Sequence, residues 1–112
     1  MKNPFSTPIV DLDRETIKKG LADGSILLVD VREPNEWQAG HIAGSVSFPL
    51  SRFNPAALPD PAGKRLVFSC RSGNRSQSAV MNARAAGLPY SEHYKGGFKD
   101  WADSGEPVVT GD

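Results

Sequence analysis

A single cysteine is the residue of this chain best suited to nucleophilic chemistry. Cys70 is the only cysteine among 112 residues, and it follows the apolar run at residues 66–68 with one serine between them. It opens a short segment that continues with Arg71, Ser72, Gly73, Asn74, Arg75 and Ser76. A strand, a loop of small residues and a helix N-terminus together build a concave site where backbone N–H groups converge on negative charge. Thiolates rather than thiols attack, so the pattern predicts a Cys70 nucleophile with a lowered pKa.

The distribution of charge agrees with this interpretation. Residues 61–91 hold five basic side chains and no acidic one, whereas the remainder holds all 13 acidic residues and the other eight basic ones. The Cys70 segment lies inside the basic window, which would draw a small anion toward the thiol. Two simpler explanations stand beside it: a lone cysteine is often a small buried apolar residue, and charges of solvated helices and loops can cluster by accident.

The elements that must position Cys70 follow from alternating strand and helix patterns. The predicted strands are residues 9–10, 26–29, 45–48, 66–68 and 90–94, and the predicted helices run from Asp13 to Gly24, from Pro34 to Gly40, from the Cys70 segment to Gly87 and from Gly97 past Trp101. Residues 52–58 fit one helical turn or two, and the tail from Glu106 is predicted to be frayed. This alternation implies βαβ units and a parallel sheet with helices on both faces. Ligands of such sheets bind beyond the carboxyl ends of the strands, where Cys70 falls.

Length and composition predict one domain, residues 1–112, with a core at about residues 8–105 and short tails. The chain is 38% hydrophobic and 23% charged, which is typical of a globular protein with a real core. One cysteine excludes an internal disulfide and suits a reducing compartment. The segment Met1–Ser6 lacks the apolar stretch of a secretory signal, and the longest apolar run, residues 26–29, is far shorter than a membrane span. We therefore expect a cytoplasmic protein without a membrane partner, and its zero net charge argues against nucleic acid.

Three further motifs accompany the Cys70 segment. The chain reads Asp30-Val31-Arg32-Glu33, then Gly-His-Ile-Ala-Gly-Ser at residues 40–45 followed by Pro49, and finally Gly96-Gly97 with Trp101 four residues on. Together with the Cys70 segment, and in their order along the chain, they resemble the D-V-R-E, G-H-I-x-G-[AS], cysteine-loop and G-G-x-x-x-W motifs of the rhodanese family. The resemblance implies an α/β protein with the three-layer α/β/α rhodanese-like fold and a five-stranded parallel sheet.

The resemblance also implies a thiosulfate sulfurtransferase that works without a cofactor. The Cys70 thiolate would attack the outer sulfur of thiosulfate, and a persulfide on Cys70 would then pass to an acceptor such as cyanide, a thiol or a protein, in ping-pong covalent catalysis. The loop from Ser72 to Ser76 would hold the persulfide with backbone N–H donors. Arg71 is placed to meet the departing sulfite, whereas Arg75 could brace the loop or touch the anion.

Several alternatives stay open at this point. Cys70 could be a persulfide carrier fed by a partner protein, or the domain could serve protein interaction. The related phosphatases and arsenate reductases resemble C-x5-R, but this chain has only four residues between Cys70 and Arg75, and a tighter loop suits one sulfur atom better than a tetrahedral oxyanion. A mercaptopyruvate donor is disfavoured, because family members of that type tend to carry a small uncharged residue where this chain has Arg71.

The other motif residues are predicted to be structural. Asp30 and Arg32 fit an internal ion pair at the end of a strand better than a substrate contact. His41 fits a hydrogen-bonded structural histidine, with no second histidine spaced to form a metal site. His93 is predicted to lie on the surface of a strand. The aromatic residues Trp37, Phe98 and Trp101 fit the core, and the last two could also line the mouth of the site.

Overall fold

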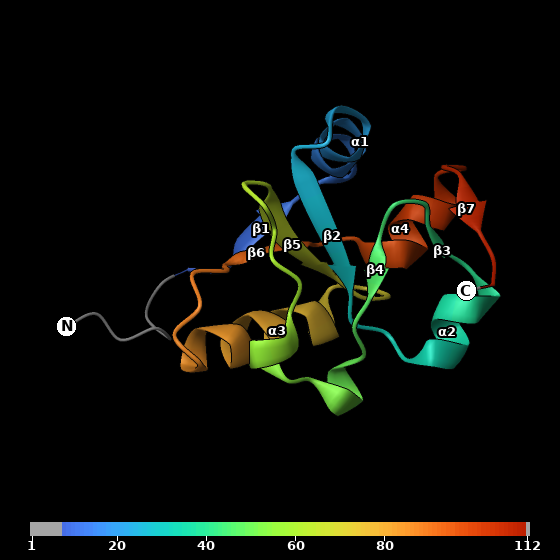
Figure 1. Cartoon of the computed structure of the whole chain (residues 1–112). Helices are drawn as coiled ribbons and strands as arrows, with labels where there is room; N and C mark the ends of the chain where they lie inside the picture. The colour runs from blue at the N-terminus through green and yellow to red at the C-terminus, as the bar shows by residue number, and fades with distance from the viewer. Residues whose placement is uncertain (1–7, 112) are drawn as a thin grey trace.

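A five-stranded parallel sheet forms the centre of the molecule (Figure 1). The computed structural model describes residues 8–111. The strands stand in the order β1 (Val10–Leu12), β6 (Glu92–Tyr94), β5 (Arg65–Ser69), β2 (Ile26–Asp30) and β4 (Val46–Ser47), and every pairing is parallel. This confirms the predicted sheet, with strand boundaries within two residues of those expected. The carboxyl ends of β2, β5 and β6 meet at one edge, and Cys70 follows β5 there.

Within residues 8–111, four helices connect and cover the strands. They are α1 (Arg14–Asp23), α2 (Pro34–Ala39), α3 (Asn74–Ala85) and α4 (Gly97–Asp103), with two short 3-10 helices, η2 (Leu50–Arg52) and η3 (Pro55–Ala57), after β4. The ends of α1 are those the sequence indicates. The Asp13 carboxylate accepts a hydrogen bond from the Thr16 N–H, and Gly24 ends the helix in the left-handed conformation at φ 76°.

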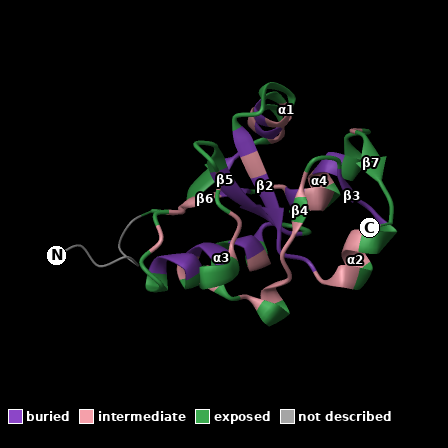
Figure 2. Cartoon of the chain, in the orientation of Figure 1, coloured by how far each residue is buried: buried purple, intermediate pink, exposed green. Residues whose placement is uncertain are grey.

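The sheet carries helices on both faces, so the predicted three layers are confirmed. Figure 1 shows α1 and α4 on one side of the sheet and α3 on the other. The buried side chains divide accordingly, since Ile17 of α1 and Trp101 of α4 pack in one cluster while Ala79, Val80 and Ala83 of α3 pack in a second. Neighbouring residues of the central strands alternate between the clusters, and Figure 2 shows these strands as the most buried part of the fold.

A small second sheet was not predicted from the sequence. Strands β3 (His41–Ile42) and β7 (Val108–Val109) pair in antiparallel fashion, so the expectation of a frayed tail from Glu106 is wrong for this segment. The Trp101 indole N–H donates to the Pro107 carbonyl at 2.8 Å and fixes the chain just before β7. Two-residue strands carry too little alternation to be recognised in a sequence.

The sequence predicts neither a secretory signal nor a membrane span, and these two predictions concern different parts of the chain. The segment Met1–Ser6, read as lacking a secretory signal, lies outside the described residues. Within residues 8–111, none of the helices has the length and hydropathy required to cross a membrane.

The packing of α1 on β2 depends on a glycine. A Cβ atom at Gly20 would overlap the side chain of Ile26, which is itself in the core. Gly20→Ala should therefore lower the free energy of unfolding by about 1–3 kcal/mol, even though alanine favours helix, because the well-packed core must shift. Urea denaturation measures the change. The neighbouring exposed substitution Lys19→Ala should stay within about 0.5 kcal/mol of the wild type, and equal stability of the two variants would contradict the close approach.

Candidate active site

The Cys70 thiol is buried among hydrogen-bonding groups. Cys70 is 1% exposed and lies directly after β5, and residues 70–76, here called the Cys70 loop, wrap around its sulfur. The Gly73 backbone N–H donates to Sγ at 3.1 Å, and the thiol donates to the Ser76 hydroxyl at 3.5 Å. Ser76 lies in the first turn of α3 and is fully buried. The predicted arrangement of strand, loop and helix N-terminus is therefore present around the sulfur.

Opposing influences set the pKa of Cys70. Burial is the largest and raises the pKa, because the anion is removed from water. The Ser76 hydroxyl and the backbone N–H groups of Ser76, Ser72 and Gly73 lower it, and together they outweigh burial. The pKa of Cys70 thus lies below its ordinary value, which makes the thiolate more available for attack.

The N-terminus of α4 holds the Cys70 loop from outside. The Phe98 N–H donates to the Cys70 carbonyl at 2.8 Å, and the Lys99 N–H donates to the Arg71 carbonyl at 3.0 Å. With these two carbonyl groups occupied by α4, the loop can offer its N–H groups to the sulfur. The start of α4 therefore supports the site without reaching the thiol itself.

Two glycines allow the backbones to approach so closely. Gly97 has φ 65°, and a Cβ there would stand 2.5 Å from the Cys70 carbonyl oxygen and 2.6 Å from that of Arg71. Gly73 has φ 92°, and a Cβ there would overlap the Lys95 carbonyl oxygen. The sequence indicates Gly97 only as part of a turn before a helix, and the structure adds its close contact with the Cys70 loop.

Arg75 braces the loop against α2. Its guanidinium donates to both carboxylate oxygens of Glu36, at 2.7 and 3.0 Å. This contact holds the pKa of Glu36 at about 2, chiefly through the Arg75 hydrogen bonds, against burial and with help from the Glu33 backbone N–H. Of the two roles considered for Arg75, the structure thus shows bracing. Nothing in the sequence linked residues 36 and 75.

Arg71 has the opposite environment. Its side chain is exposed beside the buried sulfur and forms no hydrogen bond or ion pair with any residue between 8 and 111. Asn74 and Ser72 are exposed too, whereas Gly73 and Ser76 are buried. The Cys70 loop therefore presents one unpaired guanidinium to solvent at the rim of the site.

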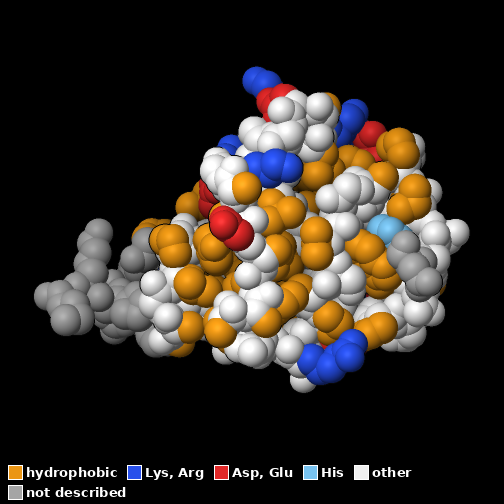
Figure 3. Space-filling model, viewed as in Figure 1, with side chains coloured by type: hydrophobic (Ala, Val, Ile, Leu, Met, Phe, Trp, Pro, Cys, Tyr) orange, Lys and Arg blue, Asp and Glu red, His pale blue; other side chains and the backbone are white. Residues whose placement is uncertain are grey.

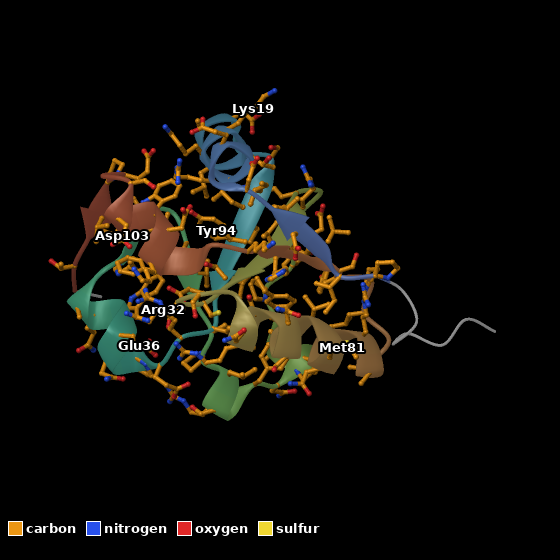
Figure 4. The ribbon with its side chains drawn as sticks, turned by 180° about the vertical axis from the view of Figure 1, so that it is seen from behind. Lys19, Arg32, Glu36, Met81, Tyr94 and Asp103 are labelled. Carbon is orange, nitrogen blue, oxygen red and sulfur yellow. The ribbon has the colours of Figure 1, made fainter. Side chains whose placement is uncertain are left out.

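Asp30 and Arg32 form the internal pair that the sequence indicates. The Arg32 guanidinium donates to both Asp30 oxygens, between 2.7 and 3.1 Å, and also to the Gly40 carbonyl at 2.8 Å. It lies 4.2 Å above the ring centre of Phe98. Figure 4 shows Arg32 between α4 and α2, with Glu36 nearby on α2. The pair ties the end of β2 to the two helices that support the Cys70 loop.

The predicted aromatic and histidine residues fall into different places. His41 is buried, hydrogen-bonded through Nδ1 to the Trp37 carbonyl and stacked on the Trp37 ring at 3.6 Å, so no contact joins it to Cys70 within the described part of the chain. Trp101 is in the core against Tyr94. The prediction for His93 is wrong, because its side chain is fully buried between the sheet and α3.

The basic window of residues 61–91 does not form one positive patch. Arg65 pairs with Glu92, Arg75 pairs with Glu36, and Arg84 is buried. In the view of Figure 3, basic side chains stand near the top and bottom of the face, with mostly hydrophobic and uncharged atoms and some acidic ones between them. An anion that approached the site would therefore meet Arg71 and the loop N–H groups rather than the charge of the whole window.

Comparison with known proteins gives the same family as the motifs. A family model described as the rhodanese-like domain matches residues 13–104, which include β2, β4, β5 and β6 of the sheet, helices α1 to α4 and the Cys70 loop. This chain belongs to the rhodanese-like family.

Three known proteins illustrate what this rhodanese-like chain is similar to. The uncharacterized protein slr1261 of Synechocystis is 40% identical over 100 residues, covering 89% of this chain and 56% of that protein, so the chain spans little more than half of this relative. The thiosulfate:glutathione sulfurtransferase of Saccharomyces cerevisiae is 32% identical, covering 77% of this chain and 71% of the yeast protein. The solved structure of the human single-domain sulfurtransferase TSTD1 superposes with a TM-score of 0.69 at 31% identity, covering 87% of this chain and 96% of the human one.

The brace between Arg75 and Glu36 predicts a pH-dependent stability of this rhodanese-like fold. The pKa of Glu36 in the folded state, about 2, lies below its ordinary value of 4.5, so the pair stabilises the fold fully above about pH 4.5 and loses this effect as the pH falls toward 2. Glu36→Gln should lower the free energy of unfolding by on the order of 1–2 kcal/mol at neutral pH. This is less than the free energy that corresponds to the whole pKa shift, because part of the carboxylate stays in solvent. Urea denaturation between about pH 7 and 3 measures this cost.

The matched control for this experiment is Glu15→Gln. Glu15 lies in the first turn of α1, and its exposed carboxylate stands 4.0 Å from Lys18. Its removal should change stability by less than about 0.5 kcal/mol at either pH. A Glu36→Gln cost that persists undiminished at the acidic end would show that the ion pair is not its source.

Proposed function

We propose that this protein is a thiosulfate sulfurtransferase that carries sulfur as a persulfide on Cys70. The single observation that supports this most is the buried Cys70 sulfur, which accepts a hydrogen bond from the Gly73 N–H, is hydrogen-bonded to the Ser76 hydroxyl and has a lowered pKa. A persulfide is anionic near neutral pH, so the donors that favour the thiolate also favour the intermediate. Membership of the rhodanese-like family and the names of the yeast and human relatives support the same assignment.

The first half of the cycle loads the sulfur. The Cys70 thiolate attacks the outer sulfur of thiosulfate, a new S–S bond forms, and the S–S bond of thiosulfate breaks with its electron pair leaving on sulfite. No proton is transferred in this step when Cys70 starts as the thiolate. The unpaired guanidinium of Arg71 is the group suited to meet the departing sulfite, because it is exposed at the rim and no residue between 8 and 111 neutralises its charge.

The second half passes the sulfur on. A nucleophilic acceptor, such as cyanide or a thiol, attacks the outer sulfur of the persulfide, and the electron pair of the broken S–S bond returns to Cys70 as a thiolate. The acceptor is proposed to be a small thiol, which is the class named for the yeast relative. A persulfide carrier fed by a partner protein would use the same Cys70 loop, so reactivity toward free thiosulfate separates the two functions.

The geometry disfavours phosphatase or arsenate reductase chemistry. Those reactions need a loop wide enough for a tetrahedral oxyanion and an arginine directed at it. Here Arg75, the arginine after the four-residue spacing, is engaged with Glu36 through both of its terminal nitrogens. Sulfur transfer therefore fits the loop better.

Intact-mass analysis tests the proposed cycle directly. Reduced protein treated with thiosulfate should gain the mass of one sulfur atom, and cyanide should remove it with release of thiocyanate. Cys70→Ser should gain nothing. Absence of the added sulfur in the wild-type protein would reject thiosulfate as the donor and favour a protein-fed carrier.

The role of Arg71 predicts a separate kinetic effect. Arg71→Ala should raise KM for thiosulfate about five- to tenfold, because a charge-assisted hydrogen bond to the anion is lost, while the stability of the fold hardly changes. Steady-state thiocyanate formation measures KM. Lys64→Ala is the charge-matched control, since Lys64 is an exposed residue just before the amino end of β5, opposite the site. An equal KM in the wild type and in Arg71→Ala would remove Arg71 from sulfite recognition.

A further inference from the structure

A chain of hydrogen bonds leads from the buried thiol to the surface. The Cys70 thiol donates to Ser76 Oγ at 3.5 Å, Ser76 Oγ lies 2.8 Å from His93 Nδ1, and His93 Nε2 lies 2.6 Å from Asp11 Oδ1. One assignment of protons satisfies every link: the Ser76 hydroxyl donates to Nδ1 of a neutral His93, and its Nε2–H donates to Asp11.

The fold builds this chain from three strands and a helix. His93 lies in β6 directly beside Asp11 of β1 in the parallel register, and beside Phe68 of β5 on its other side. Ser76 reaches His93 from α3 and, like His93, is fully buried. The Asp11 carboxylate is half-exposed and lines a surface pocket together with Asp13, Arg14, Lys95 and other residues of α1, β6 and α4. The inner end of this chain of hydrogen bonds is thus buried, and its outer end meets solvent.

We propose that His93 is a positioning residue that receives the thiol proton of Cys70 through Ser76, with Asp11 as its counter-ion. This inference rests on the proposed use of Cys70 as the nucleophile and names the group that ionises it.

The proton transfer balances without any further reactant. The thiol proton moves from Sγ to Ser76 Oγ as the Ser76 hydroxyl proton moves to Nδ1 of His93. The products are a Cys70 thiolate that accepts a hydrogen bond from Ser76, an imidazolium on His93, and the Asp11 carboxylate unchanged. A buried imidazolium needs a counter-charge, and Asp11 supplies it through the 2.6 Å contact.

Other charged groups near Asp11 and His93 come from the neighbouring elements. Lys95 Nζ of the segment after β6 lies 3.9 Å from Asp11 Oδ2, and Asp13 and Arg14 line the same pocket at the start of α1. The guanidinium of Arg75 in α3 is bound to Glu36 and so is not directed at His93. Asp11 is thus the carboxylate in direct contact with His93.

If His93 accepts the proton, Asp11 changes the pKa of Cys70 in the direction opposite to that expected from direct repulsion between two anions. A carboxylate near a thiolate repels it, so removal of the Asp11 charge by itself should favour the thiolate and lower the pKa of Cys70. If Asp11 instead stabilises the imidazolium that accepts the proton, its removal should disfavour the thiolate and raise the pKa of Cys70. The sign of the change therefore separates a proton-accepting chain from a merely nearby charge.

The experiment measures the rate of iodoacetamide alkylation of Cys70 between about pH 5 and 10 in Asp11→Asn and in the wild type. Asparagine keeps an acceptor for His93 Nε2–H and removes only the charge. At about pH 6 we expect roughly fivefold slower alkylation in Asp11→Asn, with the two rates converging at high pH, where both thiols are ionised. Asp13→Asn is the matched control, because it removes a charge from the same pocket, keeps a good N-cap for α1 and does not touch His93.

A second variant tests His93 itself. His93→Asn keeps a hydrogen-bond acceptor for Ser76 but has no group that takes up the proton, so it should slow alkylation at about pH 6 at least as much as Asp11→Asn. Unchanged or faster alkylation of Asp11→Asn would overturn the proposal, as would a pH profile of His93→Asn equal to that of the wild type. Alkylation needs no sulfur donor, so this outcome is independent of whether thiosulfate loads Cys70.

Discussion

Holding a sulfur anion beneath the protein surface is the physical requirement on which the rest of this structure depends. Burial of Cys70 alone would suppress its ionisation, because an anion removed from water loses its hydration. Donors on several sides reverse that effect: the Gly73 N–H at 3.1 Å, the Ser76 hydroxyl, and the backbone of Ser72 and Ser76. A persulfide on the same atom has the same need, so one arrangement of donors serves both the nucleophile and the proposed intermediate.

Distant parts of the chain keep those donors in place. The start of α4 binds the carbonyl groups of Cys70 and Arg71, and the missing Cβ of Gly97 makes that approach possible. On another side, Glu36 of α2 holds Arg75, and the buried pair of Asp30 and Arg32 links β2 to the same region. The loop is thus held by contacts from α2 and α4 as well as by its own hydrogen bonds, and the Arg71 guanidinium stays exposed, as its proposed contact with an incoming anion requires.

Much of this fold could be predicted from local patterns. The unbroken apolar run of β2, the Asp13 cap and the left-handed Gly24 each carry their signal within a few neighbouring residues. The contacts that complete the site could not be predicted, since they join residues far apart in sequence: 39 positions separate Arg75 from Glu36, and 82 separate His93 from Asp11. A histidine in a three-residue strand gives no local sign of which neighbours bury it. The roles of Gly97, Glu36 and His93 therefore emerge only from the three-dimensional arrangement.

The most direct test of this account is the ionisation of the Cys70 thiol in the folded and unfolded protein. Thiolate absorbance at about 240 nm, measured against pH in buffer and in concentrated urea with Cys70→Ser as the blank, compares the two states. The loop donors predict that the folded thiol ionises at a lower pH than the unfolded one. Ionisation at the same or a higher pH in the folded protein would mean that burial dominates, and would contradict the claim that this loop is built to hold an anionic sulfur.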